Sequence, residues 1–299
     1  MSNKISIGVI GAGKWGQALH FALSQKQEVY ITSRTPRDIK NFTDLQTVLE
    51  CEYLIIAIPS QEVRNWLEKN FKFNGQKILV ASKGIEASSG KFLNEIYSQF
   101  VPEKNLGFIS GPSFAAEVIK GLPAAIAINS KSKKLYNEFE KFFPDFLKTY
   151  YSKDVTGAEI AGAYKNVLAI ASGICEGLHL GKNAQASLIS RGLVEMQRFG
   201  KSFGAKESSF IGLSGAGDLF LTASSSMSRN YRVGLGLAKN KKLDQILEEL
   251  GEVAEGVKTS EAIYKLSTEH NIYTPIANEV KLILDGKNPQ DSLKDLLNS

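Results

Sequence analysis

The chain has 299 residues, of which 43% are hydrophobic and 22% charged, so it is long enough for about two globular domains. Its formal net charge of +5 favours small anionic ligands, and no dense Lys/Arg stripe interleaved with aromatic residues points to nucleic acid as a partner. Its two cysteines, Cys51 and Cys175, lack CxxC spacing, and no apolar run reaches the roughly 18 residues that a bilayer span needs. We therefore predict a cytoplasmic protein without membrane insertion.

The first half of the chain alternates short apolar runs with helix-like stretches. Because the apolar runs are continuous, each is typical of a strand that is buried on both faces of a parallel sheet. The stretches between them are typical of the helices that cover such a sheet. The predicted strands are 4–11, 28–33, 53–59, 77–84, 106–111, 124–129 and 147–152, and the predicted helices are 15–25, 61–70, 91–99 and 132–142.

Strand signals disappear after residue 152. The remaining stretches have helical periodicity and are joined by Gly-rich or charged turns. We predict an α/β fold in which a Rossmann-type, mainly parallel sheet domain (1–152) is followed by an all-helical domain (153–299). The first is expected to bind a dinucleotide and the second a substrate, with a cleft between them. The predicted helices of the second half are 154–179, 185–203, 229–239, 243–250, 258–269 and 274–285.

The first predicted strand runs into "GVIGAGKWGQAL", which contains the spacing Gly11-x-Gly13-x-x-Gly16. In a dinucleotide site the first glycine allows a tight turn, the second lets the backbone approach a pyrophosphate, and the third permits close helix–strand packing. The helix that follows offers N–H donors to the phosphates. An incidental glycine-rich turn is the alternative, but the strand–turn–helix context favours the dinucleotide.

The second predicted strand ends in "SRTPR", where an NAD site usually has a carboxylate for the ribose hydroxyls. Ser33 and Arg34 stand there instead, so Arg34 is a candidate clamp for the 2′-phosphate of NADP, with Arg37 or Lys14 in support. The alternative is a solvated surface arginine.

Polar residues follow three later strands, at Pro59-Ser60, at Ser82-Lys83-Gly84 and at Ser110-Gly111-Pro112-Ser113. Open α/β sheets bind ligands beyond the carboxyl ends of their strands, so these groups are expected to line one crevice. Lys83 could meet a substrate oxygen or a phosphate, or it could simply leave the sheet for water. Ser113 is explained equally well as a helix N-cap.

The helical half contains "GLSGAGDLFLT" and "SRNYRVG". The first places Asp218 and Thr222 after a glycine turn, and the second places Ser228, Arg229 and Asn230 at the start of a helix, where phosphate is readily held. Ordinary capping of surface helices would also account for Asp218 and Ser228.

Lys165 lies on a predicted helix whose surrounding positions are small or apolar. A buried ammonium group needs a partner or a ligand, because it otherwise loses several kcal/mol of hydration. If this face of the helix meets a nicotinamide, Lys165 can protonate a carbonyl oxygen as hydride reaches the carbon, with Asp218 orienting it and with Lys83 and Arg229 stabilising charge.

Seven segments in chain order together resemble the NAD(P)-dependent glycerol-3-phosphate dehydrogenases of the bacterial biosynthetic kind. The resemblance extends from about residue 5 to residue 285, and the ordered set is specific where each piece alone is not. The segments are "GAGKWGQAL", "SKGIE", "SGPSFAAEV", "GAYKNVLAIASGICEGL", "GLSGAGDLFLT", "SRNYRVG" and "EVAEGVKT".

The resemblance implies reversible hydride transfer between NAD(P)H and dihydroxyacetone phosphate, which gives sn-glycerol 3-phosphate for phospholipid synthesis. It makes Lys165 the proton donor and acceptor, with Lys83 and Asp218 completing the catalytic set. It implies substrate contacts at Lys83, Gly111, Ser113, Asn166, Asp218, Thr222, Ser228, Arg229 and Asn230. It implies nucleotide contacts at Trp15, Arg34, Lys83, Ala115, Arg229, Val253 and Glu255, to which the glycine motif adds Gly11, Gly13, Lys14 and Gly16.

The sequence departs from the family pattern at Lys14, Tyr164 and Ala116, where a small polar residue, an aliphatic residue and a lysine respectively are more usual. The chain is also shorter than many members after residue 286. None of these changes removes a catalytic group. Lys14 adds positive charge near the nucleotide phosphates. Because Arg34 stands in place of the carboxylate, we expect NADP as the preferred cofactor and NAD as an alternative. A homodimer is common among relatives.

Two other functions are compatible with parts of the sequence. One is a related two-domain β-hydroxyacid or ketopantoate reductase, although the "SRN" phosphate site favours a phosphorylated ketone. The other is a non-catalytic NADP-binding sensor, which would not need Lys165 and Asp218 together. No metal site is expected, because the three histidines, His20, His179 and His270, are scattered without ligand spacing.

Overall fold

The computed structural model describes residues 6–297, and its contacts divide the chain into two compact units. The sheet unit holds the chain up to Ser82 together with Leu93–Val155, and the helical unit holds Lys83–Phe92 and the chain from Thr156 onward. No sequence pattern had separated Lys83–Phe92 from the strand that precedes it. Lys83 therefore belongs to the helical unit, although it follows a strand of the sheet unit.

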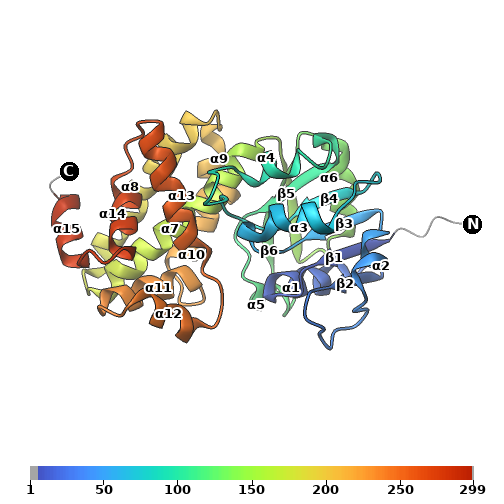
Figure 1. The fold of residues 1–299 in the computed structure, drawn as a ribbon, viewed down its shortest axis with the longest axis horizontal. Helices are drawn as coiled ribbons and strands as arrows, with labels where there is room; N and C mark the ends of the chain where they lie inside the picture. The colour runs from blue at the N-terminus through green and yellow to red at the C-terminus, as the bar shows by residue number, and fades with distance from the viewer. Residues whose placement is uncertain (1–5, 298–299) are drawn as a thin grey trace, which may run out of the picture. The chain divides into compact units, whose positions relative to one another are not determined.

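The sheet unit is built on one seven-stranded sheet with the order β2-β1-β3-β4-β5-β6-β7 (Figure 1). Every neighbouring pair is parallel except β5 and β6, so the predicted mainly parallel sheet is confirmed. The strand order reverses between β1 and β3, and a parallel sheet of this kind binds ligands at that point. The strands are β1 (Ile7–Ile10), β2 (Val29–Thr32), β3 (Tyr53–Ile56), β4 (Lys77–Val80), β5 (Leu106–Ser110), β6 (Ala124–Asn129) and β7 (Leu147–Ser152).

Both faces of the sheet are covered, as the continuous apolar runs required. Val9 and Ile55 belong to one apolar cluster, whereas their neighbours Ile10 and Ile56 belong to another, because successive side chains of a strand point to opposite faces. The first cluster includes residues of α1 (Lys14–Leu23), α5 (Ala115–Val118) and α6 (Lys133–Phe139). The second includes residues of α2 (Leu45–Leu49), α3 (Val63–Asn70) and α4 (Leu93–Tyr97), and Figure 1 shows α3 in front of the strands. Short 3₁₀ turns are η1 (Ser60–Glu62), η2 (Glu103–Asn105) and η3 (Glu140–Phe142).

The helical unit contains no strand among its described residues. Its core surrounds α7 (Val155–Gly177), which is buried along most of its length because apolar residues occur on all sides of it. The other helices are α8 (Gly181–Ser202), α9 (Glu207–Ile211), α10 (Asp218–Ala223), α11 (Arg229–Ala238), α12 (Leu243–Leu250), α13 (Glu255–Glu269), α14 (Pro275–Leu284) and α15 (Pro289–Leu297), with a π-helical turn η4 (Leu213–Gly217) before α10. The six helices predicted here are all present.

Two glycines let α7 and α11 touch backbone to backbone. A Cβ atom on Gly173 would lie 2.1 Å from the carbonyl oxygen of Tyr231, and one on Gly234 would lie 2.1 Å from the carbonyl oxygen of Ile170. Any larger residue at either position would push the helices apart. The crossing therefore fixes the start of α11, which carries Arg229, relative to the helix that carries Lys165.

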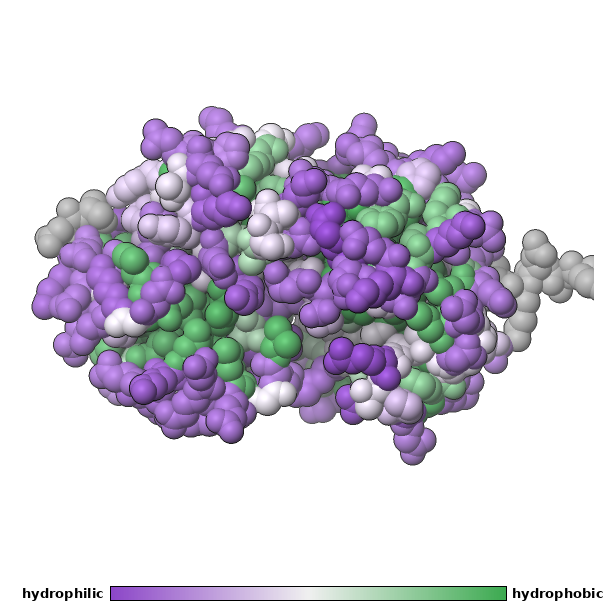
Figure 2. Space-filling model, viewed as in Figure 1, coloured by the Kyte–Doolittle hydropathy of each residue, from purple (hydrophilic) through white to green (hydrophobic). Residues whose placement is uncertain are grey.

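Polar and charged residues cover most of the face seen in Figure 2, with apolar residues showing between them. Within residues 6–297, no helix is both long enough and apolar enough to cross a bilayer. Cys51 and Cys175 are buried free thiols.

Candidate active site

The loop between β1 and α1 has the geometry that the glycine motif predicts. Gly11 has a φ of +107°, which favours glycine, and a Cβ atom on Gly16 would lie 1.8 Å from the carbonyl oxygen of Gly11. A Cβ atom on Gly13 would meet nothing within 4 Å, and no side chain caps the N-terminus of α1. Gly13 therefore borders open space at the N-terminus of α1, which fits the close approach of a pyrophosphate.

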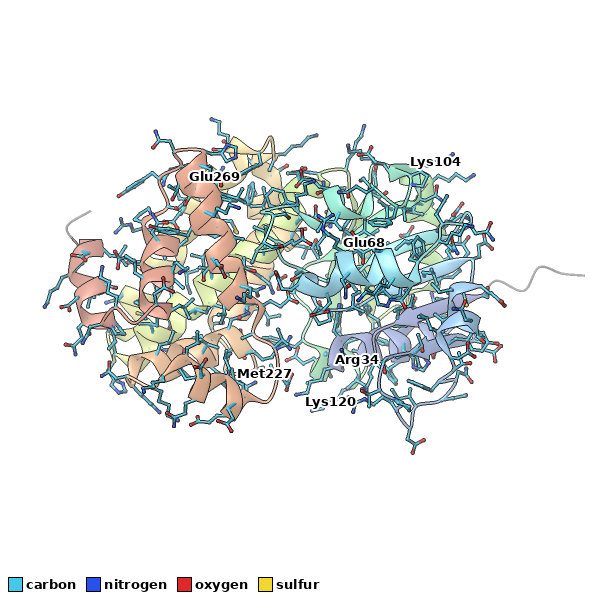
Figure 3. All side chains as sticks on the ribbon, viewed as in Figure 1. Arg34, Glu68, Lys104, Lys120, Met227 and Glu269 are labelled. Carbon is cyan, nitrogen blue, oxygen red and sulfur yellow. The ribbon has the colours of Figure 1, made fainter. Side chains whose placement is uncertain are left out.

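Arg34 lies two residues beyond the end of β2 and is exposed beside α1 (Figure 3). The Ser33 hydroxyl donates to the carbonyl oxygen of Thr35, 2.7 Å away, which closes the turn in which Arg34 sits. Lys14 is exposed at the first position of α1, whereas Trp15 and Ala115 are partly buried against the same apolar cluster. Arg34 and Lys14 thus offer two exposed cations in the sheet unit.

The "SGPS" turn after β5 belongs to the sheet unit. Gly111 has a φ of +110°, and the Ser113 hydroxyl donates to the Gly111 carbonyl oxygen, 3.2 Å away. Phe114, not Ser113, is the N-cap of α5. The simple capping explanation of Ser113 is therefore wrong.

Lys165 and Asp218 form the centre of the site in the helical unit. Lys165 is only 8% exposed, and its Nζ atom donates to Oδ1 of Asp218 at 2.6 Å and to Oγ1 of Thr222 at 2.8 Å. Nζ of Lys83 donates to the other carboxylate oxygen of Asp218 at 2.7 Å. One buried carboxylate therefore serves two ammonium groups, and this cluster carries a surplus of one positive charge when all three groups are ionised.

The charges in this cluster shift each other's proton affinities. Burial lowers the pKa of Lys165 to about 8, and the charges of Lys83 and Arg229 add to this effect, while Asp218 opposes it. Burial alone would raise the pKa of Asp218, but the ammonium groups of Lys165 and Lys83 hold it below its ordinary value. Asp218 thus stays ionised, and Lys165 is poised to give or take a proton near neutral pH.

The small residues on the same side of α7 as Lys165 make room for another side chain. A Cβ atom on Gly162 would lie 3.3 Å from Cδ of Lys83, so the absence of a side chain at Gly162 lets Lys83 pack there. Lys83 pairs with Asp218, which is 135 residues away in the chain, so its side chain does not simply extend into water. Likewise Gly217 is the N-cap of α10, so the Asp218 carboxylate does not serve as the N-cap of this helix.

The start of α11 lies next to this cluster. Ser228 is its N-cap and accepts from the backbone N–H of Tyr231 at 3.3 Å, as the capping pattern predicted. Oδ1 of the buried Asn230 accepts from the backbone N–H of Gly256 at 3.0 Å, which ties the start of α13 to α11. Nη1 of Arg229 lies 3.5 Å from Oε2 of Glu252.

The remaining predicted residues of the helical unit lie near the start of α13 or on α7. Val253 is 57% exposed, and Glu255 is the first residue of α13. Asn166 is buried and makes a 3.3 Å hydrogen bond to the Gly162 carbonyl oxygen. The helical unit therefore gathers Lys83, Lys165, Asp218 and Thr222 by direct contact, whereas Gly11, Gly13, Gly16, Arg34, Gly111, Ser113 and Ala115 belong to the sheet unit.

Another buried carboxylate, which the sequence did not indicate, is Glu195 on α8. Glu195 accepts from the backbone N–H groups of Ile276 and Ala277, both at 2.9 Å, and from the Tyr164 hydroxyl at 2.8 Å. A mainly apolar cavity of about 270 Å³ adjoins Glu195 at the start of α14 and is lined by none of the Lys165 cluster. Among residues 6–297, no group of His, Cys, Asp and Glu side chains is placed to hold a metal ion.

The chain is similar to known proteins along its whole length. The models of the N-terminal and C-terminal parts of NAD-dependent glycerol-3-phosphate dehydrogenase match residues 29–136 and 154–294. The chain is 65% identical to a glycerol-3-phosphate dehydrogenase [NAD(P)+] of Sulfurimonas denitrificans, covering 98% of this chain and 99% of the relative. It is 61% identical to the protein of the same name from Campylobacter jejuni, covering 97% and 98%.

A crystal structure of glycerol-3-phosphate dehydrogenase from Coxiella burnetii superposes on the fold with a TM-score of 0.91 at 31% identity, covering 99% of each chain. Sequence and structure therefore agree: the chain belongs to the NAD-dependent glycerol-3-phosphate dehydrogenase family.

Proposed function

We infer that this protein catalyses reversible hydride transfer between NAD(P)H and dihydroxyacetone phosphate, and that the resulting sn-glycerol 3-phosphate serves glycerophospholipid biosynthesis. Family membership supports this reaction over a ketopantoate or β-hydroxyacid reductase and over a non-catalytic sensor. The single observation that carries the assignment of residues is the buried Lys165 ammonium, which shares the carboxylate of Asp218 with Lys83.

Lys165 acts as the general acid in the direction of reduction. NAD(P)H, when bound, supplies the hydride that the carbonyl carbon of the substrate takes up. Nζ of Lys165 gives its proton to the carbonyl oxygen, which becomes the hydroxyl of the product, and the neutral amine then recovers a proton from solvent. In the reverse direction the neutral amine removes the hydroxyl proton. Asp218 and Thr222 hold Nζ in place through the hydrogen bonds of 2.6 and 2.8 Å.

The surplus positive charge of the site suits a phosphorylated substrate. Lys83 stabilises the negative charge that develops on the carbonyl oxygen, and Arg229 together with the N-terminus of α11 receives the phosphate. In the helical unit, the buried polar residues Asn166, Thr222, Ser228 and Asn230 add further contacts. The proposed substrate residues are Lys83, Gly111, Ser113, Asn166, Asp218, Thr222, Ser228, Arg229 and Asn230.

NADP is the proposed preferred cofactor, with NAD as an alternative. The exposed Arg34 stands where a carboxylate would otherwise select NAD, and Lys14 adds a second cation at the start of α1. The proposed nucleotide residues are Gly11, Gly13, Lys14, Trp15, Gly16, Arg34, Lys83, Ala115, Arg229, Val253 and Glu255. Buried free thiols at Cys51 and Cys175 suit a reducing, cytoplasmic location. The homodimer stays a prediction that light scattering would test.

The decisive experiment is Lys165→Ala, assayed with dihydroxyacetone phosphate and each cofactor. We expect kcat to fall at least about 10²-fold, because general-acid help of this kind is typically worth that much. Circular dichroism should show an intact fold, and Lys182→Ala, which removes an exposed lysine of the same unit, should leave kcat unchanged. Near-normal turnover by Lys165→Ala would remove Lys165 from the mechanism.

The same assays test the cofactor. The wild-type protein should have a higher kcat/KM with NADPH than with NADH, and Arg34→Ala should bring the ratio towards one. A wild-type preference for NADH would contradict the role proposed for Arg34.

A further inference from the structure

Arg229 has an internal anionic partner that the sequence motifs did not indicate. We propose that Glu252 occupies Arg229 until a ligand phosphate displaces it, and that Glu252 thereby sets the affinity of the enzyme for its phosphorylated ligand. The inference rests on the proposed function of Arg229 as a phosphate contact. It assigns a role to Glu252, which lies one residue before the predicted nucleotide contact Val253.

The ion pair between Arg229 and Glu252 is loose. Its N–O distance is 3.5 Å, whereas the two ammonium groups on Asp218 lie 2.6 and 2.7 Å from the carboxylate oxygens. Charge-assisted hydrogen bonds are ordinarily about 2.7–2.9 Å long, so Glu252 holds Arg229 by charge without a short hydrogen bond. The side chain of Arg229 is 45% exposed and that of Glu252 is 28% exposed, so an incoming anion can reach the pair.

Glu252 also places a negative charge beside the partly exposed guanidinium of Arg229. Asp218 is already engaged by Lys83 and Lys165, and the Arg229 guanidinium is close enough to help lower the pKa of Lys165. Arg229 therefore belongs to the same positive region, and Glu252 neutralises part of it. A phosphate that binds to Arg229 must either displace the Glu252 carboxylate or tolerate its repulsion.

Glu252 lies outside regular secondary structure, between α12 and α13. Gly251 ends α12 in the left-handed conformation with a φ of +61°, and α13 begins only at Glu255, so Glu252 lies in a short connection outside both helices. The next residue, Val253, is 57% exposed, and the connection enters the core at Ala254. The hydrogen bond from Gly256 to Asn230 fixes the far end of the connection, so displacement of Glu252 need not disturb α13.

The test is Glu252→Gln, which removes the charge and keeps the shape. At low ionic strength we expect the KM for dihydroxyacetone phosphate, or the dissociation constant of NADPH measured by fluorescence without substrate, to fall about two- to fivefold, the range expected for a half-exposed ion pair. Inorganic phosphate should inhibit the variant at lower concentration. The kcat should stay within about twofold, and the gain in affinity should shrink in high salt.

Glu249→Gln is the matched control, because Glu249 is an exposed carboxylate of α12 that pairs with Lys241 and not with Arg229. A lower KM for dihydroxyacetone phosphate alone identifies the substrate phosphate as the competitor of Glu252, and a lower dissociation constant for NADPH alone identifies a nucleotide phosphate. Unchanged or weaker binding in Glu252→Gln, or an equal gain in Glu249→Gln, overturns the proposal. Failure of the wild-type protein to reduce dihydroxyacetone phosphate would instead overturn the proposed function, and the NADPH and phosphate measurements would still decide the role of Glu252.

Discussion

The two most deeply buried carboxylates of the helical unit, Asp218 and Glu195, are compensated in opposite ways. Asp218 and Glu195 are each 2% exposed. Asp218 faces two ammonium groups, whereas Glu195 accepts two backbone N–H groups and the phenol hydroxyl of Tyr164. Both carboxylates are fully hydrogen-bonded, but only the partners of Asp218 carry charge.

The pKa values follow this difference. Burial raises the pKa of Glu195 above its ordinary value, because its neutral donors do not fully oppose the loss of hydration. The pKa of Asp218 is held below its ordinary value despite complete burial, because two cations face it. A buried carboxylate that is saturated by neutral donors anchors structure, as Glu195 does by capping α14. A buried carboxylate that faces more cations than it can neutralise leaves a net positive charge, which favours an anionic ligand and proton transfer.

The same isosteric change at both carboxylates is the most direct test of whether Asp218 and Glu195 have different roles. Asp218→Asn should lower kcat by about 10²-fold, because Lys165 would then lie buried beside Lys83 with no counter-charge and would lose its proton at neutral pH. Glu195→Gln should leave kcat within about threefold of wild type, because Glu195 touches neither Lys165 nor Lys83 through any bond described above. Steady-state kinetics at pH 7 would measure both. Equal losses of kcat in the two variants would show that burial alone, and not the charge of the partners, explains the role of Asp218.

A smaller effect is expected on the pH dependence. Reduction needs protonated Lys165, so the kcat of reduction should decline as pH rises through about 8, while oxidation should rise over the same range because it needs the neutral amine. Lys83→Met removes a cation that lowers the pKa of Lys165 and frees an oxygen of Asp218. The pH at which the kcat of reduction declines should therefore be higher in Lys83→Met and lower in Asp218→Asn than in the wild-type protein. If kcat profiles of the two variants moved in the same direction, Lys83 and Asp218 would not act on Lys165 through their charges.

The two units also differ in how much of each could be predicted from the sequence. All seven strands were predictable, because a continuous apolar run between turn residues has few alternatives in a covered sheet. Lys165 was predictable too, since a lone lysine in a small, apolar helix needs a partner. Asp218 was also predicted as its orienting partner, although it lies 53 residues away and follows a π-helical turn. The hydrogen bond from Lys165 to Thr222 was not predicted, because the resemblance gave Thr222 only as a substrate contact.

Long-range contacts account for most of the structural features that could not be predicted from the sequence. The packing of Lys83–Phe92 with the helical unit leaves no local pattern. The sequence therefore predicts Lys83 at a strand end and as a charge-stabilising group, but it does not indicate the ion pair of Lys83 with Asp218. Nothing in the local sequence distinguishes Glu195 or Glu252 from a solvent-facing carboxylate of a helix or turn. Short helices such as α9 and α10, with five and six residues, carry too little periodicity to be recognised.

The smallest expected effect is at Tyr164, which precedes Lys165 in the chain but bonds to Glu195. Tyr164→Phe removes one hydroxyl and keeps the ring packed against Phe199, whose centroid is 5.3 Å away. Both oxygens of Glu195 keep a backbone N–H donor, so we expect the free energy of unfolding to fall by only about 0.5–1.5 kcal/mol, the net value of one hydrogen bond. The kcat should stay within about twofold, because the lost bond stabilises the anchor of α14 and not the ammonium of Lys165. Urea denaturation and steady-state kinetics would measure the two quantities, and a tenfold loss of kcat with unchanged stability would mean that the Glu195 cluster acts on the chemistry after all.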